Sequence, residues 1–185
     1  MRVTGGRLRG RRLPSPAAAG IRPTPSRVRE ALFNMLGGME GRTLLDVFAG
    51  SGVMSLEAIS RGAREVISVD AAHAAVRAMR AIRREWGLEG AWRIIQGQAH
   101  AALSRLAGRQ VDVVFADPPY ATGLAERLPA WLDEHGIGCD ILVIEESARI
   151  TPAWPAGWTA TRCRRYGDTC LHFLRRTNDD AREPA

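Results

Sequence analysis

The 185-residue sequence predicts an α/β fold built on a doubly wound, mostly parallel β-sheet. Short apolar runs alternate with stretches of helical period from residue 43 onward, and this alternation is typical of right-handed βαβ units. The first apolar run leads directly into a glycine-rich turn, as strands of such sheets do at a ligand-binding edge. Gly167-Asp168 separates two further β-rich segments, so we expect the sheet to end in an antiparallel hairpin.

The elements follow from this pattern in chain order. Apolar residues recur at helical spacing from Val28 to Leu36, which predicts a helix. We expect Thr24 or Ser26 to cap it and Gly37-Gly38 to end it. The expected parallel strands lie at Leu44–Val47, Val66–Val69, Arg93–Ile95, Val111–Ala116 and Ile141–Ile144. The expected helices between them lie at Val53–Arg61, Ala72–Trp86, Ala99–Leu106 and Leu124–Glu134, and the hairpin strands at Trp158–Tyr166 and Thr169–Leu174.

Composition excludes several classes of protein. Hydrophobic residues make up 45% and charged residues 25% of the chain, so it can bury a core rather than stay disordered. No apolar run approaches the roughly 18 residues that span a bilayer, and the N-terminus lacks the apolar region of a secretory signal. The three cysteines, Cys139, Cys163 and Cys170, are odd in number and lack metal-ligand spacing. We therefore expect the cysteines to be free thiols in a cytoplasmic protein. The lack of a long apolar run predicts that the protein does not bind a membrane. No candidate His/Cys cluster is seen in the sequence, so we also expect no metal site.

Positive charge is concentrated at the N-terminus. The net charge is +6, and residues 1–29 contain eight arginines and no acidic residue. Arginine grips phosphate with paired hydrogen bonds, so a basic arm suits an RNA or DNA backbone, with a merely solvated terminus as the alternative. We expect residues 1–25 to form a small basic hairpin and a proline-stiffened linker, residues 26–176 the main domain, and residues 177–185 a flexible tail. The residues expected to contact nucleic acid are Arg2, Arg7, Arg9, Arg11, Arg12, Arg22, Thr24 and Arg27.

The glycine-rich turn predicts a nucleoside-containing cofactor. Gly50 and Gly52 allow close backbone approach to a ligand, and Asp70 ends the second strand, where a ribose-binding acid belongs. A dinucleotide is disfavoured, because Ser55 replaces the third glycine and Asp46 would repel a pyrophosphate. A carboxylate there would instead attract the ammonium group of S-adenosylmethionine; a structural turn without a ligand is the alternative. The expected cofactor-binding residues are Asp46, Phe48, Ala49, Gly50, Ser51, Gly52, Asp70, Gln98 and Ala99, with Gln98 at the adenine edge.

The second candidate motif is Asp117-Pro118-Pro119-Tyr120, which directly follows an expected strand. An exocyclic amine on an aromatic base is a poor nucleophile, because its lone pair is delocalised into the ring. Acceptors held out of the ring plane, the Asp117 carboxylate and the Pro118 carbonyl, would free that lone pair, and consecutive prolines restrict their direction. Tyr120 offers a ring on which a flipped base can stack. We therefore expect Asp117, Pro118 and Tyr120 to be catalytic; a rigid surface turn is the alternative.

With these motifs in place, the chain resembles the RsmD-type 16S ribosomal RNA guanine-N2 methyltransferases. The resemblance covers Met1 to about Leu174 and is most specific in Arg2–Leu13 and Arg22–Asn34. It is supported by Asp46–Ala58 and by Asp117–Tyr120. The resemblance implies a class I, Rossmann-like methyltransferase fold with S-adenosylmethionine as methyl donor. It also implies 16S ribosomal RNA, or the small ribosomal subunit particle, as the substrate, and we expect a monomer.

Two other functions remain open on the sequence alone. DNA adenine-N6 methyltransferases use a similar Asp-Pro-Pro-Tyr motif, although this chain has little room for a DNA-reading domain. A non-catalytic RNA-binding assembly factor is the other alternative, and the intact cofactor and Asp117 motifs argue against it. Glu145-Glu146 follows the expected strand Ile141–Ile144 and is expected to line the cleft, but the sequence assigns no chemical role to Glu145 or to the four histidines.

Overall fold

The computed structural model describes residues 1–13 and 24–177 of the chain. Residues 14–23 of the expected linker, which include the candidate Arg22, and residues 178–185 of the expected tail lie outside the described residues. The chain divides into two compact units, Met1–Ala102 and Leu103–Ala185. Each unit carries one of the two motifs found in the sequence.

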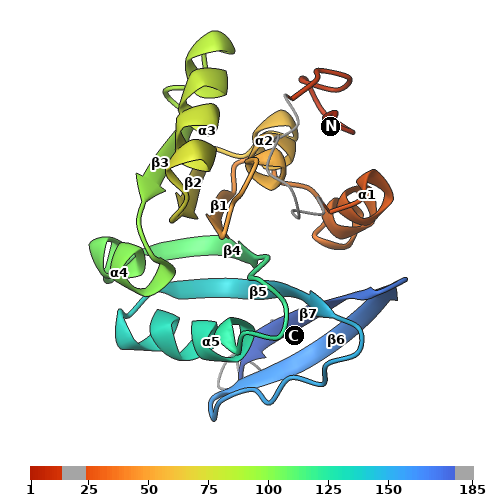
Figure 1. Cartoon of the computed structure of the whole chain (residues 1–185), viewed down its shortest axis with the longest axis vertical. Helices are drawn as coiled ribbons and strands as arrows, with labels where there is room; N and C mark the ends of the chain where they lie inside the picture. Colours follow the sequence, from red (N-terminus) through yellow and green to blue (C-terminus); the bar gives the residue numbers. More distant parts are fainter. Residues whose placement is uncertain (14–23, 178–185) are drawn as a thin grey trace, which may run out of the picture. The chain divides into compact units, whose positions relative to one another are not determined.

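The first unit holds three parallel strands in the order β3-β2-β1. Helix α2 packs against β1 and β2, α3 packs against β2 and β3, and α1 lies against α2 (Figure 1). Strands β1 and β2 are almost fully buried because their apolar side chains face helices, as expected for continuous apolar runs. The elements are α1 (Ser26–Met35), β1 (Thr43–Val47), α2 (Val53–Ser60), β2 (Glu65–Asp70), α3 (His73–Glu85), β3 (Trp92–Gln96) and α4 (Ala99–Leu103), within which the unit ends.

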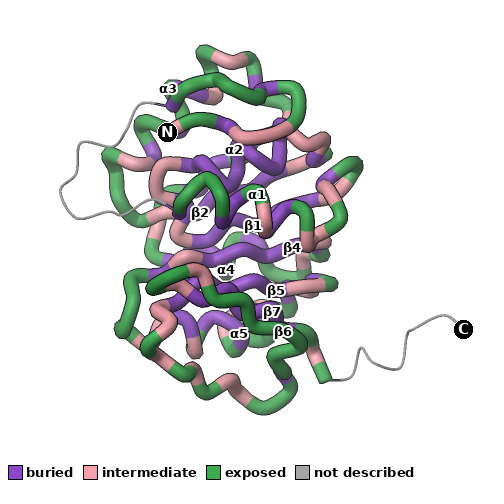
Figure 2. Tube along the Cα trace, turned by 90° about the vertical axis from the view of Figure 1, so that its right-hand side faces the viewer, coloured by how far each residue is buried: buried purple, intermediate pink, exposed green. Residues whose placement is uncertain are grey.

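The second unit holds four strands in the order β4-β5-β7-β6. Strands β4 and β5 are parallel, whereas β7 runs antiparallel to both β5 and β6. Its elements are a short 3₁₀ turn (Ser104–Leu106), β4 (Gln110–Ala116), α5 (Leu124–Glu134), β5 (Gly138–Ser147), β6 (Trp158–Tyr166) and β7 (Thr169–Arg176). Figure 2 shows β7 buried and β6 exposed over most of its length, so β6 is an open edge that carries arginines rather than apolar side chains.

The parallel strand pairs of both units and the antiparallel hairpin that ends the second unit confirm the predicted fold class. Every predicted strand and helix is present, with ends displaced by a few residues. The predicted side-chain cap of α1 is wrong. Pro25 occupies the N-cap position without a side-chain hydrogen bond, and the carbonyl oxygen of Pro25 accepts bonds from the Val28 and Arg29 amides. None of the described helices combines the length and the apolar character that crossing a bilayer requires.

The cysteines correct a second expectation. Only Cys139 is a buried free thiol among the described residues, whereas Cys163 on β6 and Cys170 on β7 form a disulfide. Their Cα atoms lie 6.5 Å apart, because the hairpin register sets the two residues diagonally across the paired strands. Three free thiols were expected from the odd number of cysteines and their lack of metal-ligand spacing, whereas the pairing of Cys163 with Cys170 depends on the register of the hairpin.

The first thirteen residues form the predicted small hairpin. Arg2 and Arg12 make an antiparallel bridge, and the Val3 amide donates to the Arg11 carbonyl oxygen at 3.0 Å. Val3 and Leu8 are 2% and 5% exposed, so apolar side chains anchor the hairpin while its arginines stay in solvent.

Candidate active site and nucleic-acid interface

The predicted cofactor turn has a strained backbone. Between β1 and α2, Phe48 has a φ of 63°, and Gly50 and Gly52 have φ values of 54° and 73°. A positive φ is rare for a bulky residue such as Phe48 and persists only where surrounding contacts enforce it. Here the Ala49 amide donates to the Val69 carbonyl oxygen at 3.0 Å, and the Gly52 amide donates to the Ala49 carbonyl oxygen at 2.8 Å. The turn is therefore a fixed shape at the carboxyl end of β1.

Asp70 joins this turn to the end of β2. One carboxylate oxygen accepts the Gly50 amide at 2.7 Å, and the other accepts the Ala72 amide at 2.7 Å. The structure thus brings together Gly50 and Asp70, twenty residues apart in sequence, as the cofactor prediction requires. A carboxylate offers about four lone-pair sites, so after these two bonds it retains sites for ribose hydroxyl groups.

The two glycines of the turn differ in what surrounds them. A Cβ at Gly50 would approach nothing closer than the Phe48 carbonyl oxygen, at 4.0 Å. A Cβ at Gly52 would lie 2.9 Å from both Met79 Cγ and Trp92 Cζ2. Gly50 therefore leaves open space where a ligand can approach the backbone, whereas Gly52 allows α3 and β3 to pack against the turn. The sequence suggested the ligand role for both.

Asp46 is buried beneath the turn, with 1% of its surface exposed. Its Oδ2 accepts hydrogen bonds from the Ser55 amide at 3.1 Å and the Ser55 hydroxyl at 2.5 Å. The hydroxyl of Ser55 also lies 2.6 Å from that of Ser68, which accepts a bond from the indole N–H of Trp92. Burial raises the pKa of Asp46 to about 7, although the bonds from Ser55 oppose the rise. The carboxylate secures the first turn of α2, and a contact with the ammonium group of a ligand stays a prediction.

The remaining cofactor candidates surround this turn or follow β3. Ala49 is buried, and Phe48, Gly50 and Ser51 are half-buried. Gln98 is exposed and precedes the buried Ala99, the first residue of α4. The Gln98 carbonyl oxygen accepts a bond from Ala102. An exposed amide at the end of β3 fits the adenine-edge prediction, which stays a prediction.

In the second unit, Asp117 follows β4 directly and opens the second motif. Asp117 is half-buried, Pro118 is buried, and Tyr120 is 41% exposed. Ala121 has a φ of 60°, and the Thr122 hydroxyl donates to the Pro119 carbonyl oxygen at 2.6 Å. The motif is thus a rigid loop between β4 and α5 that presents an aromatic ring to solvent.

Glu145 holds the tip of the Tyr120 side chain. The Tyr120 hydroxyl donates to Glu145 Oε1 at 3.1 Å and lies 2.9 Å from the Thr169 hydroxyl. Burial and the negative charges of Glu145 and Asp117 raise the pKa of Tyr120, so the phenol stays protonated at neutral pH. Glu145, on β5, is 3% exposed. The sequence left it without a role, because only the pairing of β5 with β7 shows which strand residues reach the loop.

All the described arginines predicted to contact nucleic acid are exposed. These are Arg2, Arg7, Arg9, Arg11, Arg12 and Arg27. Arg11 lies over the ring of Trp86, with its guanidinium carbon 4.2 Å from the ring centroid. Thr24 differs, because it is 5% exposed and its carbonyl oxygen accepts a bond from Arg29. The burial of Thr24 makes a direct contact with RNA difficult, whereas the arginines are free to reach phosphates.

Comparison with known proteins identifies the family. A family model described as Conserved hypothetical protein 95 matches residues 1–175. Ribosomal RNA small subunit methyltransferase D of Escherichia coli (strain K12) is 35% identical over 181 residues, covering 95% of this chain and 90% of the relative. The chain belongs to the family of ribosomal RNA small subunit methyltransferase D.

Solved structures agree with the assignment. The Escherichia coli protein yhhF has a TM-score of 0.82 and 32% identity, covering 95% of this chain and 97% of that one. An RNA methyltransferase from Salinibacter ruber, solved in complex with S-adenosyl-L-homocysteine, shares the fold at a TM-score of 0.63 and 18% identity, covering 82% and 92% of the two chains. The RsmD-type resemblance and the class I methyltransferase fold expected from the sequence are confirmed.

In this family member, a buried ionic network that was not predicted from the sequence attaches the basic hairpin to the rest of the first unit. Glu57 on α2 is fully buried and accepts hydrogen bonds from the Arg29 guanidinium at 3.2 Å and the Thr4 amide at 2.8 Å. Arg61 also pairs with Glu57. Arg29 donates in turn to the carbonyl oxygens of Thr24 and Arg2, at 2.6 and 2.7 Å.

Two arginines of α1, Arg27 and Arg29, differ in whether they take part in this network. Arg29 is 2% exposed and bonds the hairpin, whereas Arg27 is exposed. A signal for this was present in the sequence, because Arg29 lies three and four residues before Leu32 and Phe33, on the apolar face of the helix. Glu57 and Arg61 likewise have the spacing of a helical ion pair.

Proposed function

We propose that this protein transfers the methyl group of S-adenosylmethionine to the exocyclic N2 amine of a guanine in 16S ribosomal RNA. The chain is a methyltransferase of small-subunit ribosomal RNA, as its family membership and fold support. The choice of guanine N2 is the proposal. The observation that carries it is the rigid loop after β4, where Asp117 precedes a solvent-exposed ring whose hydroxyl group is held by Glu145 and Thr169.

The residues of the β1 turn fit the cofactor. S-adenosylmethionine supplies an electrophilic methyl group on a cationic sulfonium. Asp70 is proposed to accept the ribose hydroxyls, since its carboxylate retains free lone-pair sites beside the Gly50 amide. The open space at Gly50 leaves room for the ligand against the backbone. Asp46, Phe48, Ala49, Ser51, Gln98 and Ala99 are proposed to complete this site.

The residues of the β4 loop are proposed to bind and activate the guanine. The Asp117 carboxylate and the Pro118 carbonyl oxygen would accept the two hydrogens of the N2 amine, which weakens conjugation of its lone pair with the ring. As the new carbon–nitrogen bond forms, the nitrogen becomes cationic and releases a proton to Asp117. Tyr120 would stack on the guanine after it leaves its helix, in an arrangement that base–aromatic stacking stabilises by about 1–3 kcal/mol. The transfer needs no metal ion, because the departing sulfur is neutral.

The exposed arginines of the hairpin are proposed to hold the RNA backbone. Arg2, Arg7, Arg9, Arg11 and Arg12 lie in a hairpin fixed by buried anchors, and Arg27 adds a sixth exposed charge. Phosphate contacts position the RNA without reading its sequence. A small protein of this kind therefore takes its specificity from the shape of the substrate. We propose that it acts as a monomer in the cytoplasm on 16S ribosomal RNA, in naked form or in the small-subunit particle.

The test is methyl transfer to defined substrates. Small-subunit particles, naked 16S ribosomal RNA and duplex DNA, prepared from a strain that lacks the gene, are incubated with the full-length protein and labelled S-adenosylmethionine. Mass spectrometry of the nucleosides is expected to find N2-methylguanosine in the RNA. N6-methyladenine in the DNA alone would establish the DNA methyltransferase instead. Failure to bind S-adenosylmethionine by calorimetry would revive the non-catalytic assembly factor.

A further inference from the structure

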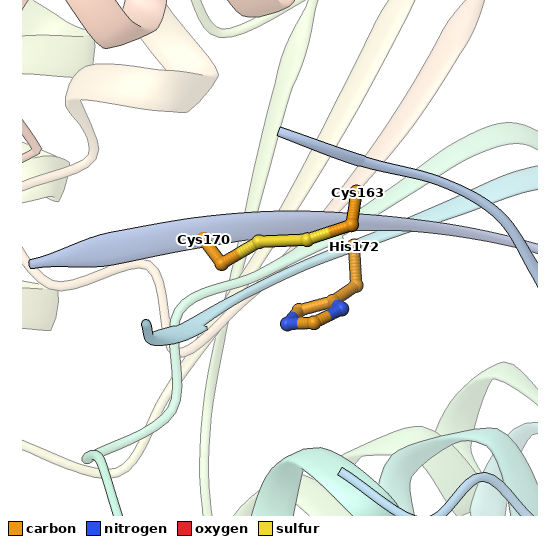
Figure 3. Close-up of side chains that lie close together, drawn as sticks. All are labelled: Cys163, Cys170 and His172. Carbon is orange, nitrogen blue, oxygen red and sulfur yellow. A yellow bond between two sulfur atoms is a disulfide. The ribbon is translucent and has the colours of Figure 1, made fainter. Parts of the chain in front are cut away.

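One face of the β6–β7 hairpin gathers two sulfur atoms and an imidazole. Cys170 and His172 are two residues apart on β7, so their side chains share a face of the strand. Cys163 pairs directly with His172 across the hairpin, which puts its side chain on that face as well. Figure 3 shows the disulfide running above the imidazole ring, and one ligand atom from each residue lies within 4.8 Å of the other two. The expectation that the chain holds no His/Cys cluster is therefore wrong.

The environment of His172 points to a missing partner. The residue is 8% exposed, and its Nε2 atom is buried without a hydrogen-bond partner among the described residues. A buried polar atom without a partner is costly to folding, so such atoms are rare in native proteins. The ring contacts Trp154 edge-on, with centroids 5.3 Å apart, and an apolar neighbour of this kind favours the neutral imidazole that binds metals.

The donor set suits one class of cation. Two thiolates and one imidazole are soft to borderline ligands, which favour Zn²⁺ over oxygen-seeking Mg²⁺ or Ca²⁺. Thiolate sulfur and imidazole nitrogen bind Zn²⁺ at about 2.3 and 2.0–2.1 Å, so donors must converge within about 4 Å of one another. The three donor atoms already lie close to that separation. Cys163 is exposed at the sheet edge, which gives an ion and a reductant a route to the site.

We propose that Cys163, Cys170 and His172 form a Zn²⁺ site in the reduced protein, and that the disulfide is its oxidised, metal-free form. A dithiol reductant supplies two electrons and two protons, which convert the disulfide into two thiols. Zn²⁺ then displaces both thiol protons and binds two thiolates and the imidazole, with a water molecule at the fourth position. Peroxide reverses the change: two zinc-bound thiolates, one hydrogen peroxide and two protons from solvent give the disulfide, two water molecules and the released ion.

None of the three proposed ligands is among the residues proposed for methyl transfer, and the test of the site does not depend on that function. Thr169, whose hydroxyl contacts Tyr120, immediately precedes Cys170. Either covalent or metal cross-linking of β6 to β7 therefore steadies the strand that supports Tyr120. The proposal concerns the binding of Zn²⁺ and its dependence on thiol redox state.

Metal binding by the full-length protein tests the proposal. The protein is reduced with a phosphine, freed of reductant without oxygen, and titrated with Co²⁺ and then Zn²⁺ in competition with a chromogenic chelator. We expect one equivalent of Zn²⁺, and thiolate-to-cobalt charge-transfer absorption in the Co²⁺ form. Protein oxidised with hydrogen peroxide is expected to bind neither ion. Cys139→Ser, which removes the buried thiol outside the cluster, is expected to behave as the wild type.

Variants of the three proposed ligands test whether each of them binds Zn²⁺. Cys163→Ser, Cys170→Ser and His172→Gln are each expected to weaken Zn²⁺ binding by more than about 100-fold, since loss of a mere supporting group costs about 10- to 100-fold. Because Cys163 is exposed, its replacement leaves the fold intact and gives the decisive comparison. The proposal is overturned if reduced wild-type protein binds no stoichiometric Zn²⁺, or if Cys163→Ser binds it as tightly as the wild type.

Discussion

The hydroxyl group of Tyr120 donates a hydrogen bond to Oε1 of Glu145, and the carboxylate of Glu145 is almost completely buried. This bond fixes the far end of the side chain of Tyr120, a residue that is 41% exposed. The side chain is thus held at its hydroxyl group while part of its surface stays accessible. Such an arrangement suits a platform for a base better than a packing role.

Tyr120 is expected to act through its ring more than through its hydroxyl. Tyr120→Ala should lower kcat/KM for the RNA substrate by about 10- to 100-fold, because stacking is worth about 1–3 kcal/mol per base. Tyr120→Phe retains the ring and should stay within a few-fold of the wild type. Steady-state methylation of small-subunit RNA measures both. Equal loss in the two variants would assign the role to the hydroxyl instead.

Substitution of Gly52 is expected to lower the stability of the fold, whereas substitution of Gly50 is expected to weaken cofactor binding. Gly52→Ala drives a Cβ against Met79 and Trp92, and such overpacking costs about 1–3 kcal/mol of the free energy of unfolding. Gly50→Ala meets open space and should lose less stability, but its methyl group occupies the proposed ligand position. Thermal unfolding and calorimetric titration with S-adenosylmethionine separate the two effects. A Gly50→Ala variant that binds the cofactor normally would remove this turn from the cofactor site.

Asp46 is expected to make stability depend on pH. In the folded protein its pKa is about 7, whereas in the unfolded chain it is near 3.8, so the folded state binds the extra proton between these values. The stabilisation is complete below the unfolded value and is lost as the pH rises toward 7. The stability of the wild type relative to Asp46→Asn should therefore fall by about 2 kcal/mol between about pH 5 and about pH 7.5. Urea unfolding at both pH values measures it, and a pH-independent difference would show that Asp46 is ionised throughout.

Replacing Arg29 is expected to lower the stability of the fold, whereas replacing Arg27, two residues earlier on α1, is expected to weaken RNA binding. Arg29→Ala leaves the carboxylate of Glu57 buried with fewer partners, and breaking such a pair costs about 3–5 kcal/mol. Arg27→Ala removes an exposed charge and should leave stability unchanged while weakening RNA binding. Chemical denaturation and RNA affinity at several salt concentrations compare the two. An Arg27→Ala variant with unchanged affinity and salt dependence would exclude Arg27 from the interface.

Local patterns of the sequence were sufficient to predict the fold. The apolar runs, the turn at Gly50 and the hairpin signal at Gly167-Asp168 each depend on neighbouring residues, and each element formed where they indicated. The pairing of Gly50 with Asp70 was predictable for the same reason, because strand ends in this fold class have known neighbours.

Features that depend on register and burial were not predictable in this way. The contact of Glu145 with Tyr120 and the cluster of Cys163 with His172 both need the alignment of strands β5, β6 and β7. The separate roles of Gly50 and Gly52 likewise depend on side chains of distant elements, which no spacing in the chain reveals.

The central claim is that Asp117 activates the target amine, and single-turnover methyl transfer to small-subunit RNA tests it most directly. Asp117→Ala is compared with the wild type at saturating S-adenosylmethionine, with cofactor affinity measured on the same samples. We expect the rate of transfer to fall by about 10²–10³-fold, the loss that follows removal of one such stabilising group, while cofactor affinity is unchanged. A transfer rate within a few-fold of the wild type would contradict the account.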